Sequence, residues 1–128
     1  MGAAFFFGPG QTFMATTLHG IRNCDTMKKA WTWLDQHGIG YAFHDYKKQG
    51  IDRAALETWV GEVGWEVLLN RAGTTFKKLP EADKQEIDAT KAVELMLAQP
   101  SMIKRPVLEI DGRLIVGFKP EVYASLIG

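Results

Sequence analysis

Apolar and polar residues follow two different periods in the first part of the chain. Residues 16–19 (Thr-Thr-Leu-His) combine β-branched and apolar side chains, which is typical of a short strand. From Asp25 to Gln36 the apolar residues recur every three or four positions, and this spacing predicts an amphipathic helix. Its apolar stripe comprises Met27, Ala30, Trp31 and Leu34. Gly38 suits the position just beyond the helix end, where a left-handed backbone is favoured.

The aromatic and alternating residues 41–46 predict a second strand, and the polar residues 47–50 predict a turn after it. Two strands joined by one helix form a β-α-β unit, in which the strands are parallel and the crossover is right-handed. His44 alternates away from its aromatic neighbours. We therefore expect it on the surface of the strand and not in a metal site.

The middle of the chain predicts a series of helical pieces. Asp52 and Asp88 are suitable caps for the two longer ones, which run through Trp59 and about Ala98. The inner face of the later helix comprises Ala89, Val93, Met96 and Leu97. Between these helices, residues 64–75 predict a short helical turn followed by a Gly/Thr loop, and a further short polar helical piece follows from Leu79.

The end of the chain predicts a hairpin and a last helix. Residues 107–110 and 113–116 are strand-like, and Asp111-Gly112 between them supplies the two positive φ angles of a type I′ turn. Pro120 suits the first position of a helix that continues over residues 121–126, because its missing N–H is not needed there.

In order, the predicted elements are β-α-β, a helical insertion, and β-β-α. A parallel pair extended by an antiparallel hairpin, with helices on its faces, is an α/β arrangement of the thioredoxin-like kind with a mixed four-stranded sheet. We expect one domain over residues 14–128, with the helical insertion at about 51–99. Residues 1–13 are expected to be an extension that is not part of this fold.

Charge and composition narrow the possible partners. The sequence has 15 Lys and Arg and 15 Asp and Glu among 128 residues, so its net charge is zero and nucleic acid is an unlikely partner. The apolar residues 3–7 are too few to span a bilayer, and they lack the basic flank of a signal peptide. We expect a cytoplasmic protein with no membrane segment.

Cys24 is the only cysteine, and it lies where the first strand turns into the first helix. Asn23 or Cys24 is the N-cap. The free N–H groups and partial positive charge of a helix N-terminus favour a thiolate, which is the reactive form. Two interpretations stay open here, a reactive nucleophile and a buried, inert cysteine, which is the commoner case. A lone cysteine forms neither an internal disulfide nor a Cys-based metal site.

Five blocks of the sequence resemble the ArsC/Spx family, and most of all its YffB-like branch of small proteins often named arsenate reductases. The blocks are Gly20–Lys28, Phe43–Tyr46, Leu69–Thr75, Met102–Val107 and Val116–Pro120. The resemblance extends over nearly everything from Thr16 to the C-terminus. It implies a thioredoxin-like fold with a helical insertion, and a cis peptide between Arg105 and the structural residue Pro106.

The resemblance also implies a mechanism. In arsenate reductases of this family a cysteine thiolate attacks arsenate, arginines bind the oxyanion, glutathione attacks the adduct, and glutaredoxin recycles the mixed disulfide. By motif, Cys24 is the catalytic nucleophile. The substrate-binding candidates are Arg71, Arg105, Lys119, Asn23 and Thr26. Guanidinium groups bind tetrahedral oxyanions bidentately, whereas a lysine such as Lys119 acts as a point charge. Without the resemblance, Arg71 would be taken for a surface arginine.

Several positions depart from the family's pattern. Gly20 stands where arsenate reductases usually have a histidine, and Arg22, which replaces a proline, is a candidate to supply the missing positive charge. Asp25 adds a negative charge that disfavours both thiolate and arsenate. Met27 removes a hydroxyl donor, and Lys119 replaces an arginine fork. Each change weakens an arsenate site more than a thiol–disulfide site.

The leading interpretation is an arsenate reductase-like, glutathione-dependent thiol oxidoreductase, with arsenate itself uncertain as substrate. No second cysteine exists, so an external thiol must resolve any adduct, and we expect glutathione as co-substrate without a tightly bound cofactor or metal.

The alternatives are an Spx-like transcription regulator that binds RNA polymerase and a non-catalytic glutathione-binding protein. Against the regulator, Met27 stands where a Cys-x-x-Cys switch needs its second cysteine. Lys28 and Lys29 are a solvated helix face or a contact patch, and the solvated face is favoured. We expect a monomer.

Overall fold

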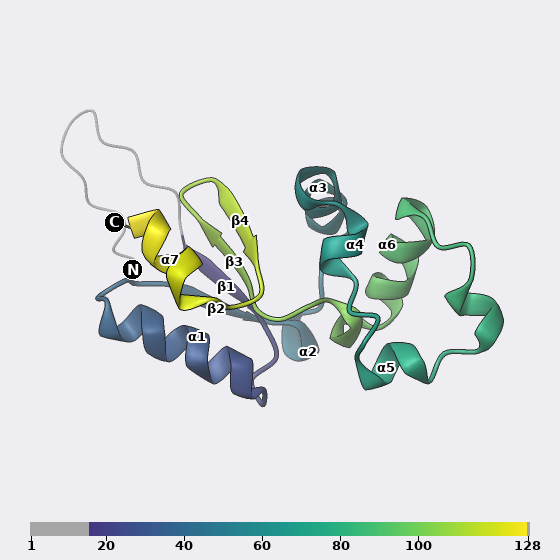
Figure 1. Ribbon diagram of the computed structural model, residues 1–128, viewed down its shortest axis with the longest axis horizontal. Coiled ribbons are helices and arrows are strands. Elements are labelled where there is room, and N and C mark those ends of the chain that lie inside the picture. Colours follow the sequence, from purple (N-terminus) through teal and green to yellow (C-terminus); the bar gives the residue numbers. More distant parts are fainter. Residues whose placement is uncertain (1–15, 128) are drawn as a thin grey trace. The chain divides into compact units, whose positions relative to one another are not determined.

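The structure is a computed structural model that describes residues 16–127, with side chains through residue 125. Its contacts divide the chain into two units (Figure 1). The sheet unit contains the described residues up to His44 together with those from Arg105 onward, and the helical unit is Asp45–Lys104. The extension predicted for residues 1–13 lies outside the described residues.

The sheet unit is built on a four-stranded mixed sheet with the strand order β2-β1-β3-β4. Its elements are β1 (Thr17–Gly20), α1 (Asp25–Gln36), β2 (Ala42–Asp45), β3 (Val107–Ile110), β4 (Arg113–Val116) and α7 (Pro120–Ile127). β3 pairs antiparallel with both β1 and β4. The predicted α/β, thioredoxin-like fold is confirmed, and so are the bounds of the first helix and of the hairpin strands.

One face of this sheet is covered by α1 and α7. Leu18 of β1 and Leu108 of β3 are register partners, and on this face they belong to one buried cluster with Tyr123 of α7. Three α1 side chains of the same cluster are fully buried: Met27, Ala30 and Leu34. Burial of a large apolar side chain stabilises the fold by about 1.5–3 kcal/mol. The predicted stripe is therefore confirmed, and its fourth member, Trp31, is half-buried and packs against the same cluster.

The turn and the last helix follow their sequence signals. Asp111 and Gly112 have φ angles of 53° and 76°, as the type I′ turn requires. Pro120 is the first residue of α7. The Gly117 amide donates to the Pro106 carbonyl at 2.8 Å, which ties the end of the hairpin to its beginning.

The helical unit is a succession of short helices. They are α2 (Tyr46–Gln49), α3 (Arg53–Val63), α4 (Trp65–Leu68), α5 (Thr74–Lys77), the 3₁₀ helix η2 (Glu81–Lys84), α6 (Ala89–Ala98) and the 3₁₀ helix η3 (Pro100–Met102). Both predicted caps are confirmed, because the Asp52 and Asp88 carboxylates accept from the Ala55 and Lys91 amides at 3.1 and 2.8 Å.

Four local predictions are wrong in this unit or at its edge. Tyr46 opens a helix and does not end the second strand, because the Asp45 carboxylate accepts from the Lys47 amide at 2.9 Å and caps α2. Residues 47–49 of the predicted turn therefore belong to that helix, and Gly50 is its C-cap. The predicted loop at residues 74–75 is the start of α5. In α6 the exposed Ala89 does not line the inner face; Ala92 does.

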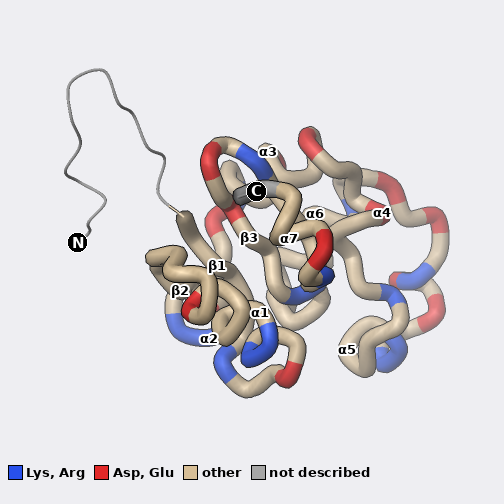
Figure 2. Tube along the Cα trace, turned by 60° about the vertical axis from the view of Figure 1, so that its left-hand side comes forward, with Lys and Arg blue, Asp and Glu red and all other residues tan. Residues whose placement is uncertain are grey.

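Residues of both charge signs are spread along the trace of each unit (Figure 2). Among residues 16–127, no helix combines the length and apolarity needed to cross a membrane.

Candidate functional site

Cys24 is the N-cap of α1, which decides between the two predicted caps. Its backbone is extended, with φ −148° and ψ 127°. The Cys24 carbonyl accepts the helical hydrogen bond of the Lys28 amide at 3.1 Å, and the Cys24 amide donates to the Arg22 carbonyl at 3.1 Å. The thiol is half-buried. Strand β1 and the first turn of α1 therefore hold the sulfur at a helix N-terminus.

The surroundings of Cys24 favour the thiolate. Burial is the largest single influence, and it raises the pKa of the Cys24 thiol. Three groups oppose it, the Met27 amide, the Arg105 guanidinium and the Thr26 amide, and together they bring the pKa below its ordinary value.

Arg105 reaches Cys24 from a distant part of the sequence. It precedes Pro106 and β3, and the Arg105–Pro106 peptide is cis, as the resemblance implied. Pro106 is buried, and its carbonyl accepts from Gly117. Arg105 influences the sulfur by a hydrogen bond as well as by charge. We call Cys24, the amides of Thr26 and Met27, and the Arg105 side chain the thiol site.

Met27 and Gly20 form a close contact beneath the thiol site. The Met27 side chain is fully buried, and a Cβ built on Gly20 would lie 2.8 Å from Met27 Cε and closer still to its Sδ. Real Cβ atoms do not approach other heavy atoms so closely. The thioether thus occupies the space into which any side chain at position 20 would extend. The sequence alone shows that Gly20 replaces the histidine of the family pattern. The structure shows that the Met27 side chain fills the space beside Gly20.

Other predicted residues do not join the thiol site through described contacts. The Arg22 guanidinium lies over the Phe43 ring, 5.2 Å from its centroid, and is not among the groups that shift the Cys24 pKa. Asn23 is exposed. Lys119 is exposed as well, and its carbonyl accepts from the Val122 and Tyr123 amides at the start of α7. The proposed replacement of the missing histidine by Arg22 gains no support from this arrangement.

Arg71 belongs to the helical unit. It is exposed, and its guanidinium lies over the Trp65 ring, 5.4 Å from the centroid. Within its own unit it is a stacked surface arginine. Its assignment to an oxyanion site remains a prediction from the resemblance.

The sequence reading missed a polar cluster on the other face of the sheet. His19, which is 8% exposed, shares a 2.6 Å hydrogen bond with Glu109 of β3. The His44 ring lies 5.2 Å from that of His19. Burial lowers the pKa of His19 more than Glu109 raises it. Strand alternation could have placed His19 opposite to Leu18, but only the register reveals Glu109 as its neighbour. No group of three or more His, Cys, Asp or Glu among the described residues could hold a metal ion.

A lone thiol at the N-terminus of the first helix of this mixed sheet defines a thioredoxin-like thiol protein. The sequence model of the ArsC family matches residues 19–126, and the chain belongs to this family.

Three relatives illustrate its place there. The structure of the YFFB (PA3664) protein is 62% identical, covers 89% of this chain and 100% of its own, and superposes with a TM-score of 0.87. An arsenate reductase (ArsC) related protein from Brucella melitensis is 61% identical over 94% of this chain and 98% of its own, with a TM-score of 0.72. The global transcriptional regulator Spx of Streptococcus pyogenes serotype M3 is 25% identical over 82% of this chain and 79% of its own. The predicted membership and its YffB-like character are confirmed.

Proposed function

We propose that this protein is a glutathione-dependent thiol oxidoreductase of the arsenate reductase type, with Cys24 as its nucleophile. The observation that carries the proposal is the thiol site, in which two helix amides and the Arg105 guanidinium lower the pKa of a half-buried thiol. These neighbours stabilise only the thiolate form, so they would not stabilise a buried cysteine whose role is packing alone.

The reaction is an exchange between sulfurs. The Cys24 thiolate attacks the glutathione sulfur of a glutathione mixed disulfide, a new sulfur–sulfur bond forms between Cys24 and glutathione, and the other sulfur leaves as a thiolate. A second glutathione thiolate then attacks the adduct, which releases glutathione disulfide and restores Cys24. Because the sequence has a single cysteine, the resolving thiol comes from outside, either glutathione itself or glutaredoxin. A reducing cytoplasm, in which the protein acts as a monomer, is the setting that this cycle needs.

Arsenate is a second candidate substrate, favoured by membership of the ArsC family and by the name of the Brucella relative. In that reaction Arg105, Lys119 and Arg71, with Asn23 and Thr26, would bind the oxyanion. Of these five residues, Arg105 is the one whose side chain lowers the pKa of the Cys24 thiol.

The Spx relative, a global transcriptional regulator by name, favours a different class, a transcription regulator. RNA polymerase as its partner is what the family resemblance implies. Met27 stands three positions after Cys24, so a Cys-x-x-Cys switch is absent from this sequence. A protein that binds glutathione without turnover is the remaining alternative.

The deciding experiment is an NADPH-coupled assay with glutathione and glutaredoxin, in which arsenate or a glutathione mixed disulfide is the substrate and Cys24→Ser is the blank. We expect Cys24-dependent turnover of the mixed disulfide and a glutathione adduct on Cys24 in the mass spectrum. Turnover of arsenate would add the oxyanion activity. An adduct without any turnover would support the binder, and a wild-type rate equal to that of Cys24→Ser would refute the mechanism.

A further inference from the structure

A shallow groove runs along the outer side of α1, in the same unit as the thiol site. Its volume is about 400 Å³. It is lined by Lys28, Lys29, Thr32, Trp33, Gln36, Phe118 and Pro120. We call it the α1 groove. Neither the sequence signals of the ArsC family nor the thiol chemistry of Cys24 accounts for it.

The floor of the α1 groove is aromatic and held in place from below. Trp33 and Phe118 are half-buried, and each meets the buried Tyr123 ring edge to face, with centroid distances of 5.4 and 4.9 Å. Rings fixed in this way lose little conformational entropy when a partner covers them. Such rings are typical of the anchoring centre of a protein interface.

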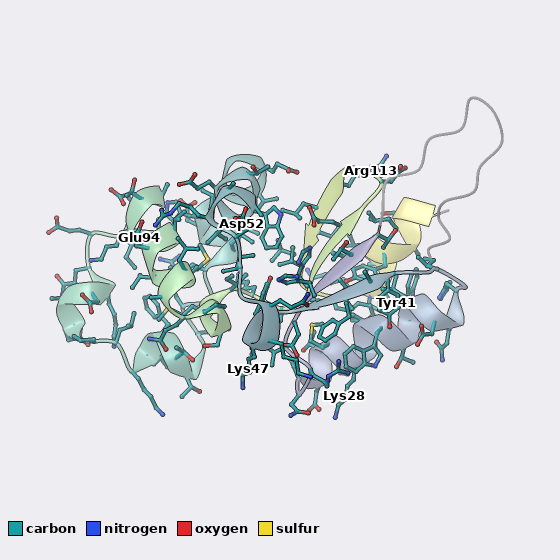
Figure 3. All side chains as sticks on the ribbon, turned by 180° about the vertical axis from the view of Figure 1, so that it is seen from behind. Lys28, Tyr41, Lys47, Asp52, Glu94 and Arg113 are labelled. Atoms are coloured by element: carbon teal, nitrogen blue, oxygen red, sulfur yellow. The ribbon has the colours of Figure 1, made fainter. Side chains whose placement is uncertain are left out.

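The rim of the groove is positively charged. Lys28 and Lys29 are both exposed, and Figure 3 shows Lys28 toward the end of α1 where the helix begins. In the described part of the chain, no carboxylate lies within 4.0 Å of either ammonium group, whereas Arg53 and Lys84 do have such partners. Two unpaired cations over an aromatic floor complement a segment that carries acidic residues around an apolar one.

The groove begins one helical turn after Cys24. The Lys28 amide donates to the Cys24 carbonyl at 3.1 Å, so Lys28 is one helical turn from Cys24 and on the same side of the helix. From Lys28 to Gln36 the helix advances by about 12 Å, a distance that about four residues of extended chain cover. A partner whose cysteine reacts with Cys24 can therefore lay the following four residues or so along the groove.

We propose that the α1 groove docks an acidic segment with an aromatic anchor, located next to the reactive cysteine of a protein substrate. The inference rests on the proposed function of Cys24 and names the class of partner for that site: a protein thiol carried as a mixed disulfide. The Cys24 thiolate attacks the sulfur of the small thiol in that mixed disulfide. A sulfur–sulfur bond forms between Cys24 and the small thiol, the bond to the protein cysteine breaks, and the protein cysteine leaves as a thiolate, while the docked segment holds the disulfide in reach of Cys24.

The test uses three synthetic peptides of equal length, each with one cysteine as a mixed disulfide with 2-mercaptoethanol. The first continues with four acidic residues around a phenylalanine, the second with lysines in place of the acidic residues, and the third with serine in place of the phenylalanine. Equilibrium binding is measured by NMR titration of the Cys24→Ser protein, and mixed-disulfide formation with wild-type Cys24 is followed by mass spectrometry.

We expect the first peptide to bind and to react roughly tenfold better than the second, and several-fold better than the third. The double variant Lys28→Glu/Lys29→Glu should reverse the order of the first two peptides. The matched control is Lys77→Glu/Lys78→Glu, which makes the same charge change at an exposed lysine pair of the helical unit and should keep the order. Equal binding of all three peptides, or an equal effect of the control, would overturn the proposal.

The two proposals fail in different ways. Selective binding of the acidic peptide to Cys24→Ser, together with no adduct on the wild-type protein, would support the docking surface and refute the thiol chemistry. Adduct formation at the same rate with all three peptides would support the thiol chemistry and overturn the docking surface.

Discussion

The sheet unit and the helical unit each contain an arginine predicted to bind substrate, and the two arginines have different surroundings. Arg105 acts by hydrogen bond and charge on the Cys24 sulfur, and the residue that follows it is buried at the start of a central strand. Arg71 is exposed and stacked on Trp65, a neighbour from its own unit. The same residue type thus tunes a thiol in one unit and lies on an aromatic surface in the other.

The different surroundings of the two arginines indicate that the thiol chemistry belongs to the sheet unit. In the sheet unit, the ends of β1, α1 and β3 lie close enough for Cys24 and Arg105 to interact although they are far apart in sequence. The salt bridges of the helical unit are of another kind. There Arg53 pairs with Glu94 at 2.8 Å between α3 and α6, with both side chains about half exposed. Such a pair adds little stability and no reactivity.

The largest expected effect contrasts one glycine in each unit. Gly20→Ala should lower the free energy of unfolding by about 1–3 kcal/mol, because its Cβ collides with the buried Met27 side chain. Gly61→Ala in α3 meets no atom within 4 Å and should raise it by roughly 0.5–1 kcal/mol through helix propensity. Urea unfolding of the two variants measures both changes.

A second experiment tests whether the Met27 side chain causes the cost of Gly20→Ala. If the Met27 side chain is the obstacle, the cost of Gly20→Ala should shrink in a Met27→Ala background, which a double-mutant cycle measures. A cost that is the same in both backgrounds, or a stabilised Gly20→Ala protein, would contradict the contact described here.

The next effect separates the two arginines directly. Arg105→Ala removes a guanidinium from the sulfur and should slow the reaction of Cys24 with glutathione disulfide by roughly tenfold at pH 7. Arg71→Ala should leave that rate unchanged within about twofold if stacking on Trp65 is its role. Stopped-flow or quenched-flow mass spectrometry gives both rates. An equal loss in both variants would show that Arg71 contributes to the thiol site after all.

The smallest effect is a difference in acid sensitivity. All three histidines of the sequence lie in the sheet unit, and His19 faces Glu109 and His44 there. Since the folded pKa of His19 is lowered, the unfolded chain binds a proton more readily, and stability should fall as the pH drops below about 6.5. His19→Gln should flatten this dependence in unfolding titrations compared with the wild type. A pH profile identical to that of the wild type would remove His19 as the cause.

Much of the sheet unit could be predicted because its signals are local and strong. The stripe of Met27, Ala30 and Leu34 fixes α1, and Asp111-Gly112 fixes the hairpin turn. The position of Cys24 at the helix start followed from the same pattern. The helices of four residues in the other unit could not be predicted this way. A helix of one turn is too short to show a repeating pattern of apolar residues. Asp45 and Gly73 are caps of such helices, and tertiary packing decides that the helices form there.

The site itself could be predicted only in part. Sequence reasoning found Cys24, and the family resemblance supplied Arg105. The Met27 amide acts on Cys24 because both belong to the start of α1, which the sequence pattern predicts. The contact of the Met27 side chain with Gly20 and that of Glu109 with His19 depend instead on how separate elements pack together. No pattern within one segment encodes these pairings.

The measurement that tests the central claim most directly is the pKa of Cys24, obtained from the pH dependence of its alkylation and of thiolate absorbance, with Cys24→Ser as the blank. The account predicts a pKa below the value of about 8.5 for a free cysteine, and a higher one in Arg105→Ala. A wild-type pKa at or above that of free cysteine, unchanged by the loss of Arg105, would contradict the assignment of Cys24 as an activated nucleophile.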